Sequence, residues 1–588
     1  MSQTLWQQWT SLIATQLSQV LGEPVAASEV VVPPDTKLGD FAVACFKYAK
    51  GRGTNPAALA KELVEKLEGM SVKGMAFVAA GPYVNVKLAS KEVVKEVVEV
   101  LSEQKAGYGM VEANKGQTFL LEYAQLNTHK EAHVGHLRNI VIGVALDQVL
   151  QASAAQVVPM TYHGDVGAHV AKCLWWLIRS KTGQGVSLTQ EQGENILQGF
   201  SDTEKTAAYL GSLYSQSTKE LEAHLEWKGE VSEIQRRLEA GDAALAHLWS
   251  VTRAWCLDEL NAIFARLGVK NDRQYLESEV VARGQAIVDE LLAKGVAKES
   301  QGAMVVDLED VKLGVFLVRK SDGTSLYATK DLALAELKLK EYPTASRSLI
   351  LVDNRQMLYF KQLFETLRRM GMSPVPEFIG YEFVTLKTGA MSSREGNIVT
   401  YQSFEEEVKA FALKEVQARH AEWPEEKQRQ VAWDLALGGI KFGMLRQDSD
   451  KVFTFDMEQA LSFEGATGPY CQYAVTRLNS IVRKASLNEK KELGDENLEV
   501  IELAQKNLAL KIAQLPERVG QAAKELRPSV IAQWCLEMAQ EVSAFYRDVP
   551  VLSAEEEVRE GRIQLVKAAQ VALSNGLHLL GIPTPEEM

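Results

Sequence analysis

Two histidines three residues apart stand at the start of a predicted helix. They are His133 and His136 in LEYAQLNTHKEAHVGHLRNIVIGVAL, where apolar residues recur at helical spacing from Leu137 onward. The first turn of a helix exposes backbone amides and the positive end of the helix dipole, which together favour an anion. Gly135 has no Cβ, so a flat base or a phosphate can approach the backbone closely. The pattern predicts a phosphate site where both imidazoles donate hydrogen bonds as negative charge builds up.

The elements around this motif alternate between strands and helices. TFLLEYA, from residue 118, reads as a buried strand, a helix follows from about 133 to 151, and AQVVPMTYHG supplies a second strand. This alternation predicts a doubly wound parallel sheet. Five of the nine histidines fall between His129 and His169, at the ends of predicted strands where such sheets bind ligands.

The chain divides into regions of different composition. A small α/β unit opens it and ends at the turn-rich linker AGYGMVEANKGQ, and a highly charged helical stretch begins at Ala171. Strand signals return at GAMVVDLED, GVFLVRK, SLILVDN and FIGYEFVTL, and beyond Ser403 the pattern is almost entirely helical. We therefore predict a first domain at 1–110, a sheet domain at 111–402 with an insertion at about 171–270, a helical connector at 403–445 and a helical bundle at 446–588.

Composition excludes several classes of protein. The five cysteines lie far apart and form no metal-binding spacing, so we expect neither a disulfide framework nor a structural metal. No apolar run reaches the roughly 18 residues that span a bilayer, and the N-terminus lacks the pattern of a signal peptide. These features predict a reduced, cytoplasmic protein with no membrane partner. The net charge of −13 alone argues against a polyanionic partner.

The histidine motif resembles the HIGH signature of class I aminoacyl-tRNA synthetases, and its surroundings resemble arginyl-tRNA synthetases. That family carries a pattern close to Asn-x-x-Lys-x-x-His-x-Gly-His-Leu-Arg. This chain has Asn127, Lys130, His133, Gly135, His136, Leu137 and Arg138 in register. Further matching blocks follow in family order: Gly164-Asp165-x-Gly167, Asp322-Gly323-Thr324 with the segment 326–333, Asp353-x-Arg355-Gln356, Met391-Ser392-Ser393-Arg394-x-Gly396-Asn397 and Gly468-Pro469-Tyr470-x-Gln472-Tyr473-Ala474. The resemblance covers essentially the whole chain.

The resemblance implies a fold and a function. The fold is α/β, with a Rossmann-like class I synthetase catalytic domain that carries a helical insertion, a small N-terminal α/β domain that contacts tRNA, and an all-α C-terminal anticodon-binding bundle. The function is ATP-dependent activation of L-arginine and transfer of the arginyl group to tRNA(Arg) by a monomer, with Mg²⁺ carried by ATP and no DNA partner. An acidic chain can still bind tRNA, because screening limits each charge to about 8–10 Å at physiological salt.

The family's second signature, Lys-Met-Ser-Lys-Ser, is altered here. The chain has Ala390-Met391-Ser392-Ser393-Arg394, so both lysines are missing. The resemblance implies that Met391, Ser392 and Ser393 bind ATP together with His133, Gly135 and His136. It also implies that Lys130, just before the histidines, compensates for the missing charge. Arg394 is a second candidate cation and Lys387 a weaker third, and the choice stays open because Arg and Lys bind phosphate differently.

A carboxylate and a tyrosine four residues apart could select the arginine side chain. Tyr327 and Asp331 share one face of a predicted helix, and Asp331 can accept two parallel hydrogen bonds from a guanidinium. The resemblance adds Glu122, Asn127, His136 and Gln356 as arginine-binding residues. In the helical C-terminal region it implies that Gln472, Tyr473 and Arg477 bind tRNA by stacking and phosphate contact.

Three other functions compete with this interpretation. A small cofactor adenylyltransferase shares the His-x-Gly-His motif, although such chains are short and lack the long helical C-terminus. A synthetase-like protein could bind RNA or arginine without catalysis. A metal hydrolase could form if His163, Asp165 and His169 converged.

Overall fold

The computed structural model describes residues 3–35, 37–70, 72–321, 326–387, 399–486 and 498–588. The chain folds into two compact units. The first comprises Met1–Glu112, Ser462–Glu525 and Val530–Met588, and the second comprises Ala113–Leu461 with Leu526–Ser529. Among the described residues no helix is long and apolar enough to cross a membrane. The predicted four-region division of the chain stays a prediction.

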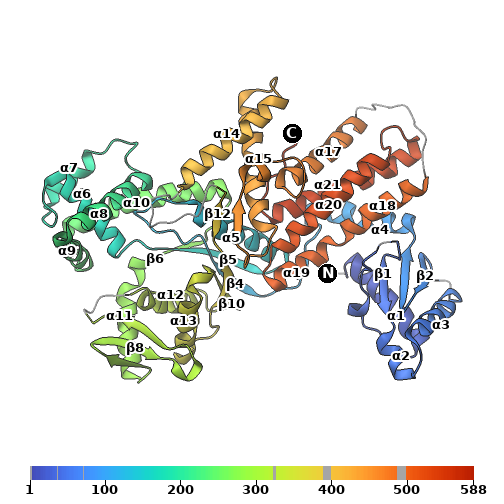
Figure 1. The fold of residues 1–588 in the computed structure, drawn as a ribbon, viewed down its shortest axis with the longest axis horizontal. Coiled ribbons are helices and arrows are strands. Elements are labelled where there is room, and N and C mark those ends of the chain that lie inside the picture. Colours follow the sequence, from blue (N-terminus) through green and yellow to red (C-terminus); the bar gives the residue numbers. More distant parts are fainter. Residues whose placement is uncertain (1–2, 36, 71, 322–325, 388–398, 487–497) are drawn as a thin grey trace. The chain divides into compact units, whose positions relative to one another are not determined.

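A five-stranded parallel sheet forms the centre of the second unit (Figure 1). Its order is β11-β10-β4-β5-β6, and every neighbouring pair is parallel. The strands are β4 (Thr118–Glu122), β5 (Gln156–His163), β6 (Arg273–Leu276), β10 (Arg347–Asp353) and β11 (Glu377–Tyr381). The chain leaves β4 toward β5 on one side, and β10 later joins the other side. The carboxyl ends of β4 and β10 therefore flank a switch point, where open sheets bind ligands.

Helix α5 (Val134–Ala152) connects β4 to β5 and carries the histidine motif at its start. It is buried on nearly all sides, so its sequence is apolar around the whole circumference rather than along one stripe. Gly143 makes this close packing possible, because a Cβ there would lie 2.1 Å from the ring of Tyr123. The predicted helix and the two predicted strands around it are confirmed.

The segment between β5 and β6 is helical and has its own apolar core (Figure 1). Trp175, Leu210, Ile234 and Leu248 are fully buried within that core. Its elements are α6 (Ala168–Thr182), α7 (Gln190–Gln198), α8 (Ala207–Ala223), η3 (Leu225–Trp227), α9 (Lys228–Glu239) and α10 (Ala243–Leu267). These helices therefore pack around a core that is separate from the one beside the central sheet.

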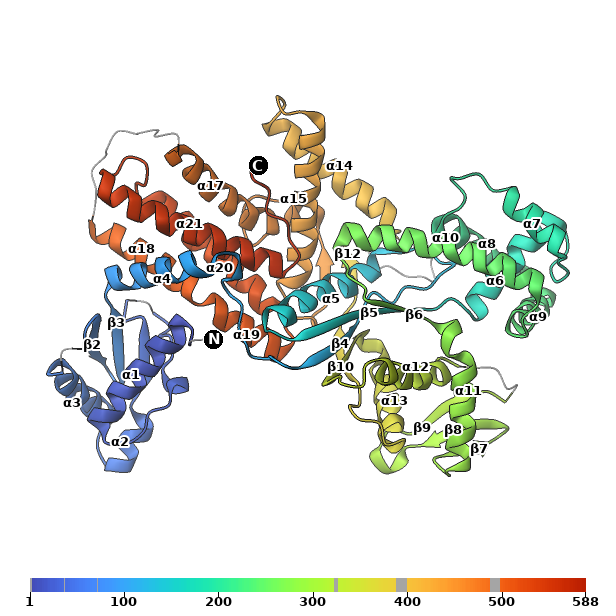
Figure 2. The same cartoon turned by 180° about the vertical axis from the view of Figure 1, so that it is seen from behind.

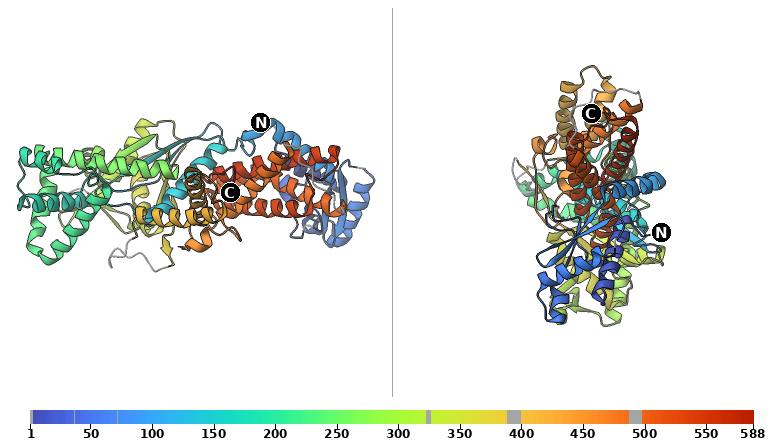
Figure 3. Two further views of the ribbon diagram at one scale, coloured as in Figure 1. Left: turned by 90° about the horizontal axis from the view of Figure 1, so that it is seen from above. Right: turned by 90° about the vertical axis from the view of Figure 1, so that its right-hand side faces the viewer.

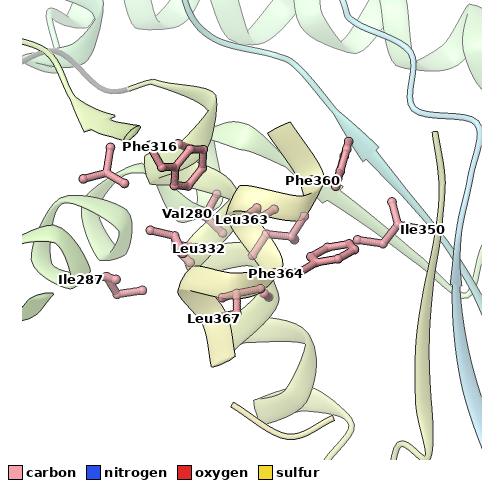
Figure 4. Close-up of a cluster of buried hydrophobic side chains, with 14 of the residues drawn as sticks. Val280, Ile287, Phe316, Leu332, Ile350, Phe360, Leu363, Phe364 and Leu367 are labelled. Carbon is pink, nitrogen blue, oxygen red and sulfur yellow. The ribbon is translucent and has the colours of Figure 1, made fainter. Parts of the chain in front are cut away.

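A second apolar cluster joins three helices to the central sheet (Figure 4). Leu332 of α12 and Leu363 of α13 are buried there beside Ile350 of β10. The cluster fixes the helices that present the carboxyl-end side chains to the switch point. Its elements are α11 (Glu277–Ala293), β7 (Ala297–Ser300), β8 (Ala303–Asp307), η4 (Glu309–Val311), β9 (Val315–Arg319), α12 (Tyr327–Glu341), η5 (Asn354–Gln356) and α13 (Met357–Arg369).

The end of the second unit is helical but contains a short strand that the helical pattern did not predict. That strand, β13 (Phe453–Phe455), pairs in parallel with β12 (Val384–Leu386). The helices are α14 (Tyr401–Arg419), α15 (Glu425–Leu445) and α16 (Met457–Ala460). A strand of three residues is too short to show a periodic pattern, and its partner strand lies 69 positions away along the chain, so the sequence gives no local signal for it.

The first unit combines a small α/β domain with a helical bundle (Figures 2 and 3). The α/β part contains α1 (Leu5–Leu21), η1 (Ala27–Glu29), β1 (Phe41–Ala44), α2 (Phe46–Arg52), α3 (Pro56–Glu68), β2 (Met75–Ala80), β3 (Tyr83–Leu88), α4 (Ser90–Gln104) and η2 (Lys105–Gly107), with an antiparallel sheet ordered β1-β3-β2. The bundle contains α17 (Gly468–Ser486), α18 (Leu498–Ala513), α19 (Leu515–Glu525), α20 (Ser529–Asp548) and α21 (Glu556–Leu579), and α4 packs against α18 and α21.

Candidate active site

A cavity of about 670 Å³ opens at the carboxyl ends of β4 and β10. It brings together eight residues predicted from the sequence, from the strand end, the loop after it and three different helices. They are Glu122, Asn127, His133, Gly135, His136, Tyr327, Asp331 and Gln356. Met391, Ser392, Ser393 and Arg394 lie outside the described residues.

The two signature histidines stack on each other at the start of α5. Their ring centroids lie 3.7 Å apart at an interplanar angle of 23°. The backbone N–H of His133 donates to Nδ1 of His136 at 3.2 Å, so that nitrogen is an acceptor and the ring proton sits on Nε2. Burial and the nearby charges of Lys130 and Arg355 lower the pKa of His133 to about 4, and burial also lowers the pKa of His136. Both rings are therefore neutral N–H donors near pH 7.

Three other histidines hold the backbone around the cavity. Nδ1 of His163 donates to the carbonyl of Leu126 at 2.8 Å, and Nε2 of His169 donates to the carbonyl of Gly164 at 3.1 Å. His129 is buried between two threonine hydroxyls, at 3.0 and 2.9 Å. These contacts give the three rings structural roles in fixing the loop that precedes α5.

Asp165 is likewise engaged in structure rather than in metal binding. Its carboxylate accepts hydrogen bonds from Ser278 N at 2.9 Å, from Ser278 Oγ at 2.7 Å and from Arg253 at 2.8 Å. It thereby ties the end of β5 to α10 and α11. In the described part of the chain, no group of three or more His, Cys, Asp or Glu side chains is arranged to hold a metal ion.

Asp331 lies in the cavity next to the hydroxyl of Tyr359, which donates to its carboxylate. Burial raises the pKa of Asp331 to about 7, and the negative charges of Glu277 and Glu122 add to that rise. Tyr327 lies one helical turn away and is 60% exposed. The carboxylate and the phenol thus face open space in the cavity as the i, i+4 spacing predicts.

Two further carboxylates at this end of the cavity already have cationic partners. Glu122 pairs with Lys338 and Glu277 pairs with Lys330, and all four side chains are almost completely buried. Among the described residues, Asp331 has no ion-pair partner. Three carboxylates against two lysines leave one negative charge, which a guanidinium ligand can neutralise.

Further polar side chains complete this wall, and some of them had been predicted from the sequence while others had not. Gln125 donates to Glu122 at 3.2 Å and accepts from Asn139 at 3.1 Å, so it orients the strand end. Asn127 packs on Gly164, where a Cβ would lie 2.3 Å from its Oδ1. Gln356 is exposed at the start of α13. Glu277 and Tyr359 gave no sequence signal, because each reaches the cavity through a contact distant along the chain.

The predicted phosphate cations have different partners. Lys130 lies over the ring of Tyr214, with 4.9 Å between Nζ and the ring centroid. Lys387 is exposed and pairs with Asp456 at 2.7 Å. Arg355, which the sequence analysis did not single out as a phosphate cation, pairs with Asp353 at 2.6 Å and lines the cavity.

The described residues that follow position 398 contact the start of α5. The carbonyl of Val399 accepts from Val134 N at 3.2 Å, while Tyr401 N donates to the carbonyl of Ala132 at 2.8 Å. Buried Arg138 donates to the carbonyls of Glu382 and Lys451 at 2.8 and 2.5 Å. The conformation of the segment after residue 398 is therefore coupled to the start of α5.

The predicted tRNA-binding residues lie in the other unit, on α17. Gln472 is fully buried and donates to the carbonyl of Pro583 at 2.8 Å, so it holds the C-terminal segment inside the unit. Tyr473 is exposed and Arg477 is half-buried. The guanidinium of Arg477 lies 4.7 Å from the ring centroid of Tyr473 and 4.5 Å from that of exposed Tyr546, a residue the sequence analysis missed.

Comparison with known families accounts for most of the chain. The model for tRNA synthetases class I (R), catalytic domain, matches residues 96–457, more than half of the sequence. The chain belongs to the arginyl-tRNA synthetase family. The arginyl tRNA synthetase N terminal domain matches residues 7–88, and the DALR anticodon binding domain matches 471–588. Matches along the whole chain exclude a short, single-domain adenylyltransferase.

Relatives of this arginyl-tRNA synthetase family member match it from end to end. Arginine–tRNA ligase of Bdellovibrio bacteriovorus is 34% identical over 95% of this chain and 94% of its own length. The enzyme of Treponema denticola is 31% identical over 99% of both chains. The Thermus thermophilus arginyl-tRNA synthetase structure aligns with a TM-score of 0.77 and 27% identity, covering 98% of this chain and 100% of that one. The predicted family and fold class are confirmed.

Proposed function

We propose that the chain is an arginine–tRNA ligase that activates L-arginine with ATP and transfers the arginyl group to the 3′-terminal adenosine of tRNA(Arg). An arginine carboxylate oxygen attacks the α-phosphorus of ATP, and pyrophosphate leaves as arginyl-adenylate forms. A ribose hydroxyl of the tRNA then attacks the adenylate carbonyl, and AMP leaves. No protein nucleophile takes part, so positioning and charge stabilisation supply the catalysis.

The observation that carries the proposal is the unbalanced carboxylate Asp331 in the same cavity as two neutral signature histidines. Asp331 takes the guanidinium of arginine as a two-pronged acceptor, and Tyr327 provides a flat wall. Asn127 and Gln356 contact the head or the side chain of the arginine. Glu122 acts through its pair with Lys338, which sets the shape and charge of the wall.

The histidine side of the cavity suits phosphate oxygens. His133 and His136 present N–H donors beside the helix start, and Gly135 leaves room for the nucleotide. Mg²⁺ is proposed to arrive on the phosphate oxygens of ATP, because Mg²⁺ is usually bound through substrate phosphates rather than in an all-protein cage. Met391, Ser392, Ser393 and Arg394 are proposed to complete the ATP site.

Lys130 is the proposed main replacement for the missing signature lysines. It lies close enough to both signature histidines for its charge to lower their pKa values, whereas Lys387 is held at the surface by Asp456. We expect Lys130→Ala to reduce pyrophosphate exchange strongly while arginine binding stays near wild type. Near-normal exchange would contradict this assignment.

The anticodon end of the tRNA is proposed to contact Tyr473 and Arg477. The exposed ring of Tyr473 can stack on an unpaired base, and the half-buried guanidinium of Arg477 beside it can pair with a phosphate. The protein is proposed to act as a cytoplasmic monomer, and its five cysteines are all unpaired and buried.

The deciding experiment is ATP–pyrophosphate exchange with purified protein, run with each of the twenty amino acids and with or without tRNA(Arg). We expect exchange with arginine alone among them, and family membership implies that it depends on the tRNA. Exchange driven by another amino acid refutes the specificity. Binding of arginine and tRNA without exchange indicates a non-catalytic relative. A metal ion found in the purified protein in the absence of ATP supports the metal hydrolase.

A further inference from the structure

Two lysines share one tyrosine ring at the junction of the sheet and the helical insertion. Lys130 comes from the loop before α5, Lys172 from α6 and Tyr214 from α8. The Nζ atoms lie 4.9 Å and 5.9 Å from the ring centroid of Tyr214, within the range of cation–π attraction. Each of the three side chains is only partly exposed.

Backbone packing fixes the position of this ring. Gly211 lies one helical turn before Tyr214, and a Cβ on Gly211 would lie only 2.7 Å from the backbone nitrogen of Glu131. The glycine therefore lets α8 rest directly on the residue that follows Lys130. The thiol of Cys173, next to Lys172, donates to the carbonyl of Leu210 at 3.2 Å and ties α6 to α8.

The charges in this cluster have no acidic partner in the described part of the chain. Neither Lys130 nor Lys172 forms an ion pair with a carboxylate there, unlike Lys330 and Lys338 beside the arginine end of the cavity. Burial lowers the pKa of Lys130, and the like charge of Lys172 lowers it further. Two cations held together without an acid are stabilised by a multiply charged anion.

We propose that Lys130 and Lys172 together bind the β- and γ-phosphates of ATP, and that Tyr214 of the insertion is a positioning residue for both lysines. The proposal rests on the proposed function for the identity of the anion. It assigns a role to Lys172 and Tyr214, which lie in a part of the chain without a signature motif. The helical insertion thereby supplies part of the pyrophosphate site.

The location favours ATP over the backbone of an RNA. The charge of Lys130 lowers the pKa of His133, so the lysine acts on the same region as the signature histidines. The departing pyrophosphate carries several negative charges and needs more than one cation. The second signature offers only Arg394 where the family pattern has two lysines.

The first test compares two lysines on the same helix by measuring KM for ATP, arginine and tRNA in pyrophosphate exchange with the full chain. Lys172→Met should raise the ATP KM about tenfold, and Lys172→Arg should restore most of the affinity. Lys181→Met is the matched control, because Lys181 of α6 lies 5.8 Å from the ring of Phe200, a contact within the insertion. An unchanged ATP KM in Lys172→Met, or a rise in tRNA KM alone, overturns the proposal.

The second test separates positioning from folding. Tyr214→Phe keeps the ring and should hold the ATP KM within about threefold of wild type, whereas Tyr214→Leu removes the ring and should raise it about tenfold. The effects of Tyr214→Leu and Lys172→Met should not add, since both disturb one cluster. Equal losses in Tyr214→Phe and Tyr214→Leu would assign the effect to the hydroxyl instead of the ring, and equal rises in ATP and arginine KM would show that the ring serves only packing. Either result overturns the positioning role of the ring.

Direct binding of inorganic pyrophosphate keeps this proposal separate from the proposed function. Calorimetry on the full chain requires no turnover and no amino acid. If Lys172→Met weakens pyrophosphate binding about tenfold while the wild type shows no arginine-dependent exchange, the lysine site stands and the proposed function fails. Equal pyrophosphate affinity in wild type and Lys172→Met overturns the lysine site whatever the exchange assay gives.

Discussion

The two ends of the cavity solve the problem of buried charge in different ways. At the arginine end, carboxylates and lysines form buried pairs, and Asp331 is left without a cationic partner among the described residues. At the phosphate end, the donors are neutral histidines. Lys130, whose charge acts on His133, lies with Lys172 against a tyrosine, and neither lysine has an ion-pair partner in the described ranges. The arginine end therefore selects one positive charge, through its shape and through the one carboxylate that has no lysine partner. The other end keeps its charges available until several negative charges arrive.

The largest effect should come from the neutral donors at the phosphate end. His136→Ala removes an N–H aimed at the charge that develops on the α-phosphate, so kcat for exchange should fall by roughly 10²–10³. The arginine KM should change little, because the guanidinium site lies at the other end. A normal kcat together with a raised arginine KM in His136→Ala would show that the histidine acts on arginine and that the cavity does not have two separate ends.

At the arginine end, Asp331→Asn should lower kcat/KM for arginine by about 10² through loss of a charge-assisted pair. The ATP KM should stay within about twofold, because the phosphate site is untouched. Tyr359→Phe is the matched control: it removes the hydrogen bond to the carboxylate but keeps the charge, so its loss should be clearly smaller. Equal losses in both variants would mean that orientation, not charge, selects arginine.

This contrast also marks what could be predicted from sequence. The position of His133 and His136 at the sheet edge followed from local periodicity and the place of the strand ends, whereas for Asp331 periodicity gave only the helix face shared with Tyr327 and the family resemblance gave the role. Glu277 and Tyr214 reach the site through contacts with residues 53 and 84 positions away, which no local pattern encodes. Gln472 is the opposite case, a residue that a motif singled out but that a distant contact removes from the surface. It lies next to exposed Tyr473, yet it is buried and bonded to the C-terminal segment.

The pH dependence of arginine binding tests the leftover charge. The pKa of Asp331 is raised to about 7 in the free protein, and the guanidinium requires the ionised carboxylate. The arginine KM should therefore be roughly tenfold higher at pH 6 than on its plateau above pH 8. The raised pKa also affects stability, because the folded protein binds this proton more tightly than the unfolded chain does. The contribution of Asp331 to the free energy of unfolding is therefore fully present below pH 3.8 and is lost as the pH rises through about 7.

Arginine kinetics from pH 6 to 8.5 measure this effect directly. Asp331→Asn should flatten the dependence, since an amide does not titrate in this range. A thermal melt should show that arginine stabilises the protein more at pH 8 than at pH 6. If the pH dependence of the arginine KM persists in Asp331→Asn, another group titrates and the charge of Asp331 does not determine arginine binding.

The smallest effect should come from Lys387, the candidate cation that the structure pairs with an acid. Its side chain is 70% exposed, and Asp456 accepts from its Nζ at 2.7 Å. A lysine already matched by a surface carboxylate has little charge to offer a phosphate, so Lys387→Ala should change the ATP KM by about twofold or less. Lys130→Ala, measured in the same exchange assay, should produce a far larger loss. If Lys387→Ala equals Lys130→Ala, then the pairing seen here gives way when ATP binds, and an ion pair with an acid does not disqualify a lysine from the phosphate site.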